Sequence, residues 1–303
     1  MKKLIIDQGY SSAKVKFEGK NHKIMTAVCF SSDLGVAYGE EEVYTYNNQK
    51  YYVGEQAVSN ESFSTGDFGF KKTFDPLLLF SILKKLDLIE DAKNKNIELV
   101  LTLSLADWKH KDDYLAIFKE FTVNGITLGF ENITLMPQGA GAYINFVANQ
   151  NNGEHPSSAV ILDIGAVTIN TLVYENGKPQ RSHSKGYPGH GVMISIIQPF
   201  AAYLESTYSM PFSNAEAMKI FMKGKFIFNG TEQPQIEEKI NELKSQFVHK
   251  LFSSVLTSEK KILAMAEKVI FAGGGCYMLE GIKFPPNAQL TSKPYEFANV
   301  AGI

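Results

Sequence analysis

The chain has 303 residues, of which 44% are hydrophobic, and a formal net charge of −2 at pH 7. This length is enough for two lobes with a substantial core, since domains usually hold roughly 100–200 residues. No apolar run approaches the ~18–20 residues that span a bilayer, so we expect a soluble, cytoplasmic protein with no membrane partner.

Two counts of residue types exclude further classes of protein. Cys29 and Cys276 are the only cysteines, too few for a disulfide framework or a thiolate metal site, which fits a reducing cytoplasm. Arg181 is the only arginine, whereas base reading and bidentate phosphate clamps favour arginine. Direct binding of nucleic acid is therefore not expected.

Strand and helix patterns alternate through the first half of the chain. About the first 55 residues place β-branched or aromatic residues between turn residues, which is typical of strands and hairpins. A helical period begins at Pro76, and a buried strand is expected over residues 97–105. Helix, strand and helix patterns follow over residues 111–121, 131–137 and 138–150.

After a polar break at residues 149–158, a second set of elements begins with a strand, a turn and a strand over 160–174. Helical stretches are expected at about 190–208, 213–223 and 235–266, and a last strand over 268–275 leads into a helix. Strands interleaved with helices indicate an α/β fold, and the polar break is the best candidate boundary between two domains.

The two halves begin with the same plan. Residues 4–17 and 160–174 each place an aspartate, Asp7 or Asp163, inside an apolar strand, followed by any residue, a glycine, a short stretch and another strand. A carboxylate in an apolar strand costs several kcal/mol unless it is paired, hydrogen-bonded or bound to a metal. Both aspartates therefore need a partner.

Each turn has the residues of a phosphate site. In the first hairpin Gly9 permits close approach of a ligand, Tyr10 to Ser12 supply backbone N–H groups and hydroxyls, and Lys14 is a candidate to neutralise charge. The second hairpin repeats the design with Gly165, Ala166, Val167 and the hydroxyl of Thr168. Facing each other, the two turns would grip a phosphate chain, with Asp7 and Asp163 holding Mg²⁺ through its waters. The alternative for each turn is an ordinary hairpin whose aspartate binds nearby backbone N–H groups.

Three further features have both a binding and a structural interpretation. Gly273, Gly274 and Gly275 follow a buried strand, where a ligand could approach the backbone or helix and sheet pack closely. Glu216 forms a capping box with Ser213, and Lys219 lies one turn further along the same face, within reach of a nucleotide. Gln138 stands at a helix start, where its amide either orients a water or caps the helix.

Taken together and in this order, these features resemble the actin-like ATPase superfamily, which includes the chaperone ATPase domains and the sugar kinases. The segments that carry the resemblance are DQGYSSAK (7–14), LMPQGAGAY (135–143), LDIGAVT (162–168), FAGGG (271–275) and FANVAGI (297–303). Within the superfamily, YYVGEQA (51–57) and NAEAMK (214–219) look most like bacterial and archaeal actin homologues of the plasmid-segregating ParM type.

The resemblance implies a two-lobed actin-like (ribonuclease-H-like) fold, with a five-stranded mixed sheet flanked by helices in each lobe. Domain I would hold residues 1–153 plus about 285–303, and domain II residues 154–284. ATP with Mg²⁺ would lie in a cleft between them. By this resemblance, Asp7 and Asp163 would manage the magnesium and the attacking water, and Gln138 would position that water. Glu216 and Lys219 would flank the ribose and base, beside Gly273 to Gly275. The phosphate contacts would be Gly9, Ser11, Ser12, Lys14, Gly165 and Thr168.

Two departures bear on the reaction. ParM-type proteins have a glutamate where Gln138 stands, although conventional actins have glutamine, so general-base action by this residue is not expected. Ala166 and Val167 are bulkier and less polar than many second phosphate loops.

The leading hypothesis is an ATPase that forms homopolymer filaments and moves plasmid DNA through a DNA-binding adaptor protein. One alternative is a small-molecule kinase of the same fold, which needs an acceptor pocket and normally an aspartate base beside the γ-phosphate. The other is a scaffold that binds ATP without turnover.

Overall fold

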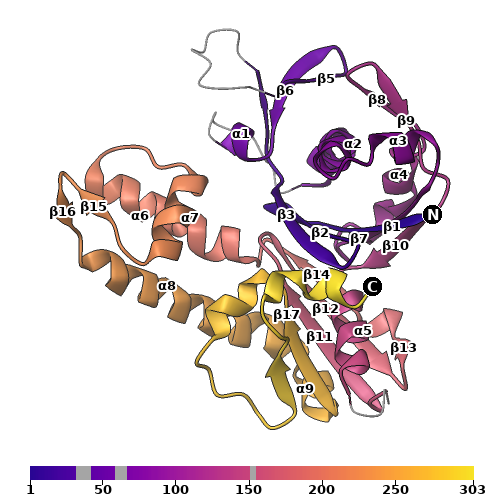
Figure 1. Ribbon diagram of the computed structural model, residues 1–303. Helices are drawn as coiled ribbons and strands as arrows, with labels where there is room; N and C mark the ends of the chain where they lie inside the picture. The colour runs from indigo at the N-terminus through magenta and orange to yellow at the C-terminus, as the bar shows by residue number, and fades with distance from the viewer. Residues whose placement is uncertain (32–41, 59–66, 151–154) are drawn as a thin grey trace. The chain divides into compact units, whose positions relative to one another are not determined.

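The computed structural model describes residues 1–31, 42–58, 67–150 and 155–303. The described chain forms two compact units (Figure 1). Unit 1 is Met1–Gly141 with Asn299–Ala301 and Ile303, and unit 2 is Ala142–Ala298 with Gly302. The expected boundary between residues 153 and 154 lies outside the described residues, so the exact domain limits stay a prediction.

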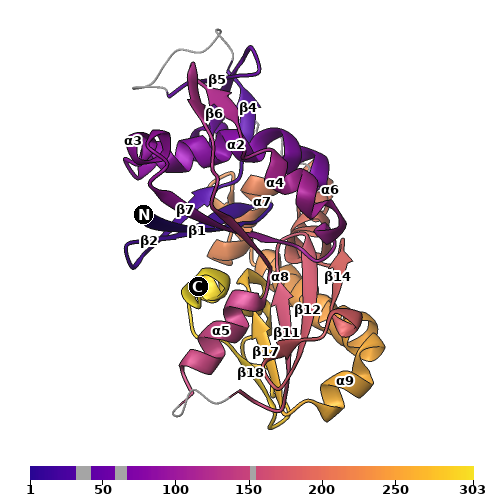
Figure 2. The ribbon, with the colours of Figure 1, turned by 90° about the vertical axis from the view of Figure 1, so that its right-hand side faces the viewer.

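Unit 1 is built on a mixed sheet of five strands, as expected (Figure 2). The central strand β1 runs parallel to β7 and antiparallel to β2. The strands in sheet order are β10 (Ile133–Pro137), β7 (Ile97–Leu103), β1 (Lys2–Gln8), β2 (Ser12–Phe17) and β3 (Lys20–Met25). The hairpin of β1 and β2 is the first of the two predicted hairpins.

A second sheet of short strands completes unit 1. Its order is β4 (Val28–Phe30), β6 (Gln49–Val53), β5 (Tyr44–Tyr46), β8 (Phe121–Val123) and β9 (Ile126–Leu128). The helix expected over 111–121 is shorter than its pattern, because α4 (Lys111–Ala116) ends before Phe121, which begins β8. The small helices are α1 (Glu55–Val58), α3 (Ile89–Lys93), the 3-10 turn Trp108–His110 and the C-terminal α10 (Ala298–Ala301).

Helix α2 (Phe68–Lys85) is enclosed within unit 1. It starts earlier than the expected Pro76, because Asp67 caps it by accepting a hydrogen bond from the Phe70 N–H at 2.9 Å. Figure 1 looks nearly along α2 and shows strands of unit 1 curving around it. Every residue from 75 to 83 is buried, and such a run covers all faces of a helix.

Unit 2 has a mixed sheet in the order β13 (Lys178–Pro179), β12 (Thr168–Glu175), β11 (Ser158–Ile164), β17 (Lys268–Ala272) and β18 (Ala288–Leu290). A sixth strand, β14 (Lys185–Pro188), pairs with β12, so this sheet exceeds the expected five strands. β11 runs antiparallel to β12 and parallel to β17, and therefore places the second hairpin at the centre of the sheet.

The helices of unit 2 follow the expected stretches. α5 (Ala140–Ala148) begins at the end of unit 1 and continues into unit 2. The others are a π-helical turn (Met193–Ile197) that continues into α6 (Gln198–Tyr208), α7 (Asn214–Lys223), α8 (Gln235–Lys250), a π-helical turn (Leu251–Leu256) and α9 (Lys260–Met265). A small hairpin of β15 (Ile227–Phe228) and β16 (Thr231–Glu232) lies between α7 and α8.

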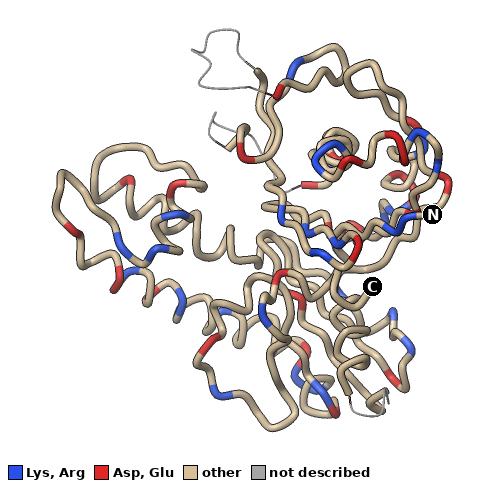
Figure 3. The backbone as a smooth tube through the Cα atoms, viewed as in Figure 1, with Lys and Arg blue, Asp and Glu red and all other residues tan. Residues whose placement is uncertain are grey.

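Charges of both signs are interspersed along the described backbone (Figure 3). On α8, for example, acidic residues in the first turn are followed by basic residues in the last turn, the arrangement that the helix dipole favours. None of the described helices is long and apolar enough to cross a bilayer.

One acid lies inside α2 and makes the stability of unit 1 depend on pH. Asp75 is 1% exposed, and burial raises its pKa from 3.8 to about 6. A carboxyl whose folded pKa exceeds its unfolded value favours folding when it is protonated. Its contribution to stability is therefore complete below about pH 4 and is lost as the pH rises through about 6.

We expect Asp75→Asn to remove this pH dependence, because the amide imitates the protonated acid. The free energy of unfolding of the variant, relative to wild type, should rise by roughly 3 kcal/mol between pH 4 and pH 7.5, since each unit of pKa shift is worth about 1.4 kcal/mol. Urea unfolding at a series of pH values measures this difference. A difference between the two proteins that does not vary with pH would contradict the assignment.

Candidate functional site

The first hairpin forms a tight turn between β1 and β2. Asp7 and Lys14 are directly opposite in the antiparallel register, so their side chains share one face of the sheet. The Gly9 N–H donates to the Asp7 carbonyl at 3.0 Å. A Cβ on Gly9 would lie 2.8 Å from the Ser12 carbonyl oxygen and 3.0 Å from Lys14 Nζ. The turn therefore needs glycine, and the Lys14 ammonium lies over it.

The carboxylate of Asp7 is buried, at 4% exposure, and is held by three side chains from different parts of unit 1. Its Oδ1 accepts hydrogen bonds from the Thr102 hydroxyl and from Gln138 Nε2, the latter at 2.8 Å. Its Oδ2 accepts a hydrogen bond from Asn299 Nδ2 at 3.3 Å. Hydrogen bonds to an ionised acceptor are among the stronger ones, so these donors offset the cost of burying the charge.

Gln138 follows the end of β10, and its backbone N–H donates to the Leu103 carbonyl at 2.9 Å. This anchors the residue beside β7, with its side-chain amide on Asp7. The structure thus joins Gln138 and Asp7, two residues that the sequence placed in separate motifs. Its role in positioning water stays a prediction.

Sequence reasoning missed Asn299, which links the C-terminus to the same site. Its side-chain oxygen accepts a hydrogen bond from the Gly139 N–H at 2.7 Å, while its amide donates to Asp7. A Cβ on Gly141 would lie 1.7 Å from the Asn299 carbonyl oxygen, so α10 approaches the start of α5 closely. Thr102 was also missed. The available signal was a hydroxyl in the buried strand Ile97–Leu103.

The second hairpin places Asp163 near the end of β11, with 4% exposure. Asn170 on β12 is its antiparallel partner, and Ala272 is its neighbour on the parallel strand β17. The Gly165 N–H donates to the Thr168 carbonyl at 2.9 Å and closes the turn. The two aspartates thus occupy equivalent, buried positions in their hairpins.

The second turn is fixed by the beginning of the next helical segment. The carbonyls of Val167, Gly165 and Ala166 accept hydrogen bonds from the N–H groups of residues 191, 192 and 193, at 3.1, 3.1 and 2.7 Å. A Cβ on Gly191 would lie 2.4 Å from the Ala166 carbonyl carbon. Gly191 is thus a further residue that the sequence analysis did not single out, and it permits this contact.

The glycine run packs against the end of β11. Gly273 has φ +84°, and a Cβ there would lie 2.5 Å from Asp163 Oδ1. A Cβ on Gly275 would lie 2.1 Å from Ile164 Cγ2, whereas at Gly274 the nearest contact is 3.7 Å away. The expected helix is a 3-10 helix of six residues, Gly274–Leu279. Contact of a nucleotide with Gly273 to Gly275 stays a prediction.

Glu216 and Lys219 lie on α7 and are exposed. The capping box predicted from the sequence is present, since Glu216 Oε2 accepts from the Ser213 N–H at 2.8 Å and from the Ser213 hydroxyl at 2.7 Å. These hydrogen bonds lower the pKa of Glu216. They account structurally for the residue, and contact with ribose or base stays a prediction.

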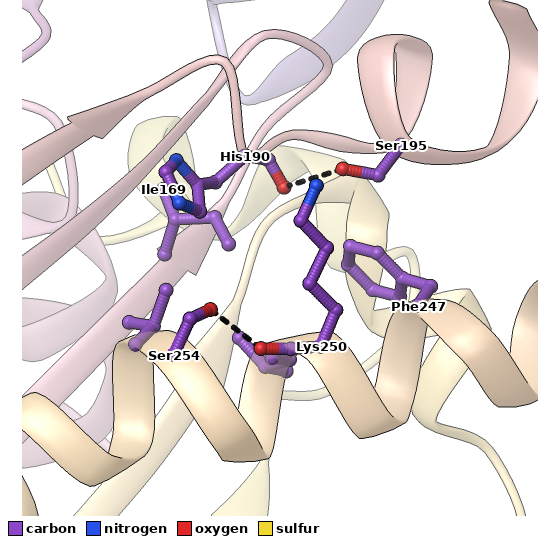
Figure 4. A pocket seen from close by; sticks show the side chains of 8 residues that line it. Ile169, His190, Ser195, Phe247, Lys250 and Ser254 are labelled. Carbon is purple, nitrogen blue, oxygen red and sulfur yellow. Dashed lines mark hydrogen bonds between the residues drawn. The ribbon is translucent and has the colours of Figure 1, made fainter.

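A small pocket in unit 2 lies beside the second hairpin (Figure 4). It is shallow, with a volume of about 0 Å³ for a water-sized sphere, and is lined by Ile169, His190, Ser195, Phe247, Lys250 and Ser254, among others. Its two serine hydroxyls donate to the backbone carbonyls of His190 and Lys250, at 3.4 and 2.5 Å. Ligand pockets usually have roughly 300–1,000 Å³, so this one does not hold a nucleotide.

Two protein families match the chain. The actin-like protein N-terminal domain family matches residues 6–141. The family of archaeal actin homologues, MreB-like, C-terminal part, matches residues 161–282. The two matches follow one another as the two predicted lobes do. Among curated proteins, none matches.

Solved structures share the fold of the chain. A ParM filament from Clostridium botulinum is 22% identical with a TM-score of 0.81, over 99% of this chain and 97% of that one. Ta0583, an archaeal actin homologue in complex with ADP, is 18% identical with a TM-score of 0.74, over 100% and 97%. Bacillus thuringiensis ParM with ATP is 15% identical with a TM-score of 0.65, over 100% and 96%. The predicted actin-like fold is confirmed.

The contact between Gly273 and Asp163 gives a direct test of the local geometry. We expect Gly273→Ala to destabilise the protein by at least ~2 kcal/mol, because the new Cβ meets the carboxylate in a backbone conformation that disfavours side chains. Gly274→Ala is the matched control and should change stability by less than ~0.5 kcal/mol. Urea unfolding measures both, and equal effects would contradict the geometry.

Proposed function

This chain belongs to the actin-like proteins, and on that premise we propose that it binds Mg-ATP between its two hairpins, hydrolyses it and forms filaments. The observation that carries the proposal is the pair of matched hairpins, each with one aspartate buried at a strand end next to a glycine turn. Two relatives of the same fold were solved with ADP and with ATP, which supports a nucleotide ligand.

The residues fit a magnesium ion that is bound through water. Within the part of the chain that the structure describes, Oδ1 of Asp7 accepts two hydrogen bonds and Oδ2 accepts one, so Oδ2 has capacity for a metal-bound water. Asp163 would contribute from the second hairpin. Mg²⁺ normally keeps several waters and takes few protein ligands, so two carboxylates in its outer shell suit it. When bound, the ion would neutralise phosphate charge.

The protein's own groups would supply the rest of the site. Lys14 lies over the first turn and would face phosphate charge. Gln138, fixed on Asp7 and anchored to Leu103, would orient the attacking water by its amide, since a glutamine is a poor general base. Ser11, Ser12 and Thr168 would contact the phosphates.

Self-assembly is the proposed output of the nucleotide cycle. A neighbour of the same fold was solved as a filament of Clostridium botulinum ParM. Nucleotide that binds both hairpins would favour one arrangement of the units, and hydrolysis would reverse that bias. A role in moving plasmid DNA in the cytoplasm would require a DNA-binding adaptor, because Arg181 is the only arginine of the chain.

Sedimentation in the presence of ATP, of ADP and without nucleotide tests self-assembly. We expect the protein to pellet with Mg-ATP and to return to the supernatant as phosphate is released. Protein that stays in the supernatant at high concentration under all three conditions would contradict the filament proposal.

The variant Asp163→Ala tests the proposal that the protein hydrolyses ATP with Asp163 at the magnesium site. We expect a loss of ATP hydrolysis of at least roughly 10²-fold with the fold intact, because the magnesium-bound water loses its acceptor on the second hairpin. Thr171→Val is the matched control. Its buried hydroxyl, one residue after the partner of Asp163, makes no hydrogen bond within the described structure, and its loss should leave hydrolysis unchanged.

Phosphate release without an added acceptor, measured on wild type and both variants, decides the outcome. Normal hydrolysis by Asp163→Ala would show that the paired-hairpin mechanism is wrong. Transfer of phosphate to a sugar or acetate would indicate a kinase, and tight ATP binding without any hydrolysis by wild type would indicate a nucleotide-dependent scaffold.

A further inference from the structure

Helix α2 carries two charged side chains into the interior of unit 1. Lys71 and Asp75 are 2% and 1% exposed and are four residues apart, so they lie on the same face of the helix. The charge of Lys71 lowers the pKa of Asp75, but the effect of burial is larger and the pKa remains raised. Apolar residues at these positions would avoid that cost. The contacts of the two side chains therefore indicate why charged residues occupy these positions.

Both side chains bind the same residue, Gln8. Lys71 Nζ donates a hydrogen bond to the Gln8 backbone carbonyl, and the Gln8 side-chain amide donates to Asp75 Oδ1 at 3.3 Å. Gln8 is the last residue of β1, directly after Asp7 and directly before Gly9. The helix thus holds the chain at the entrance to the first turn.

Lys71 also contacts Tyr10, the residue that follows Gly9 in the turn. The Lys71 ammonium lies 4.6 Å from the centroid of the Tyr10 ring, a cation–π contact. The Tyr10 hydroxyl donates to Asp107 Oδ2 at 2.9 Å. Gln8 and Tyr10 flank Gly9, so one lysine fixes both sides of the turn.

The second carboxylate oxygen of Asp75 also accepts a hydrogen bond, and it extends these contacts into a network. Asp75 Oδ2 accepts a hydrogen bond from the Tyr114 hydroxyl at 2.7 Å. Tyr114 lies on α4 and is fully buried, and it reaches Asp75 from a second element. A connected buried network of this kind has few alternative arrangements, and it therefore makes the groups that it binds more rigid.

We propose that Lys71 and Asp75 are positioning residues that hold the turn from Gln8 to Tyr10 in the conformation that receives the phosphate chain. The proposal rests on the proposed binding of ATP at this hairpin. Its physical basis is preorganisation: a turn that is already ordered loses less entropy when the ligand binds. Loss of the network should therefore weaken nucleotide binding without a matching loss of stability.

Asp75→Asn tests this, because the amide has nearly the shape of the acid but loses its charge and one acceptor oxygen. At pH 7.5 we expect ATP to bind at least roughly tenfold more weakly, while the midpoint of urea unfolding stays the same or rises. A purely structural role would move both quantities downward together. Lys71→Met, which removes the contacts to both Gln8 and Tyr10, should weaken binding further.

Ser81→Ala is the matched control. Ser81 is a buried polar residue of the same helix, but its hydroxyl donates to the Leu78 carbonyl within α2 at 2.8 Å. This variant should bind ATP like wild type. The probe is a fluorescent ATP analogue with Mg²⁺, titrated against each full-length protein.

Hydrogen exchange of the protein without nucleotide separates this inference from the proposed function. We expect Asp75→Asn to raise exchange at least severalfold in the peptide that covers residues 8–12 and not in α2. Unchanged exchange there would overturn the positioning role, as would wild-type affinity in a protein that binds ATP. If wild type binds no ATP, the proposed function fails, and faster exchange at residues 8–12 still supports the role of the network in ordering the turn.

Discussion

The buried carboxylate of Asp7 is the constraint on which the organisation of unit 1 depends. An anion with 4% exposure must find donors within the protein, and it finds them in Thr102, Gln138 and Asn299. These residues are separated from Asp7 by 95, 131 and 292 positions in the sequence. One charge therefore ties β7, the segment after β10 and the C-terminal helix α10 to the first hairpin.

The enclosed helix α2 provides the second support for this hairpin. Asp7 is held by donors around its carboxylate, while Lys71 and Asp75 hold the following residue, Gln8, from within the helix. The apolar residues that surround these charges exclude water, which strengthens the hydrogen bonds of the network. The second hairpin has a different support, because Val167 and its neighbours dock on the start of the next helical segment. The two hairpins share a plan but differ in what fixes them.

The sequence predicted the parts of this site that have local patterns. The cost of an acid in an apolar strand pointed to Asp7 and Asp163, and both are buried at the expected strand ends. The order of the motifs predicted the actin-like fold, which the comparisons confirmed. The roles of residues such as Asn299 and Gly191 could not be predicted from the sequence, because each contacts its partner only after the chain has folded. The short strand β8 was missed because its first residue, Phe121, also ends the helical pattern that begins at Lys111.

The central claim is that the two hairpins bind one magnesium–nucleotide complex. Crystals grown with a non-hydrolysable ATP analogue and Mn²⁺ in place of Mg²⁺ test it directly, since the anomalous signal of manganese locates the ion. We expect one ion on the phosphate chain, with Asp7 and Asp163 each about 4 Å from it through a bound water. An ion that contacts only one of the two aspartates, or a nucleotide bound elsewhere, would contradict the account.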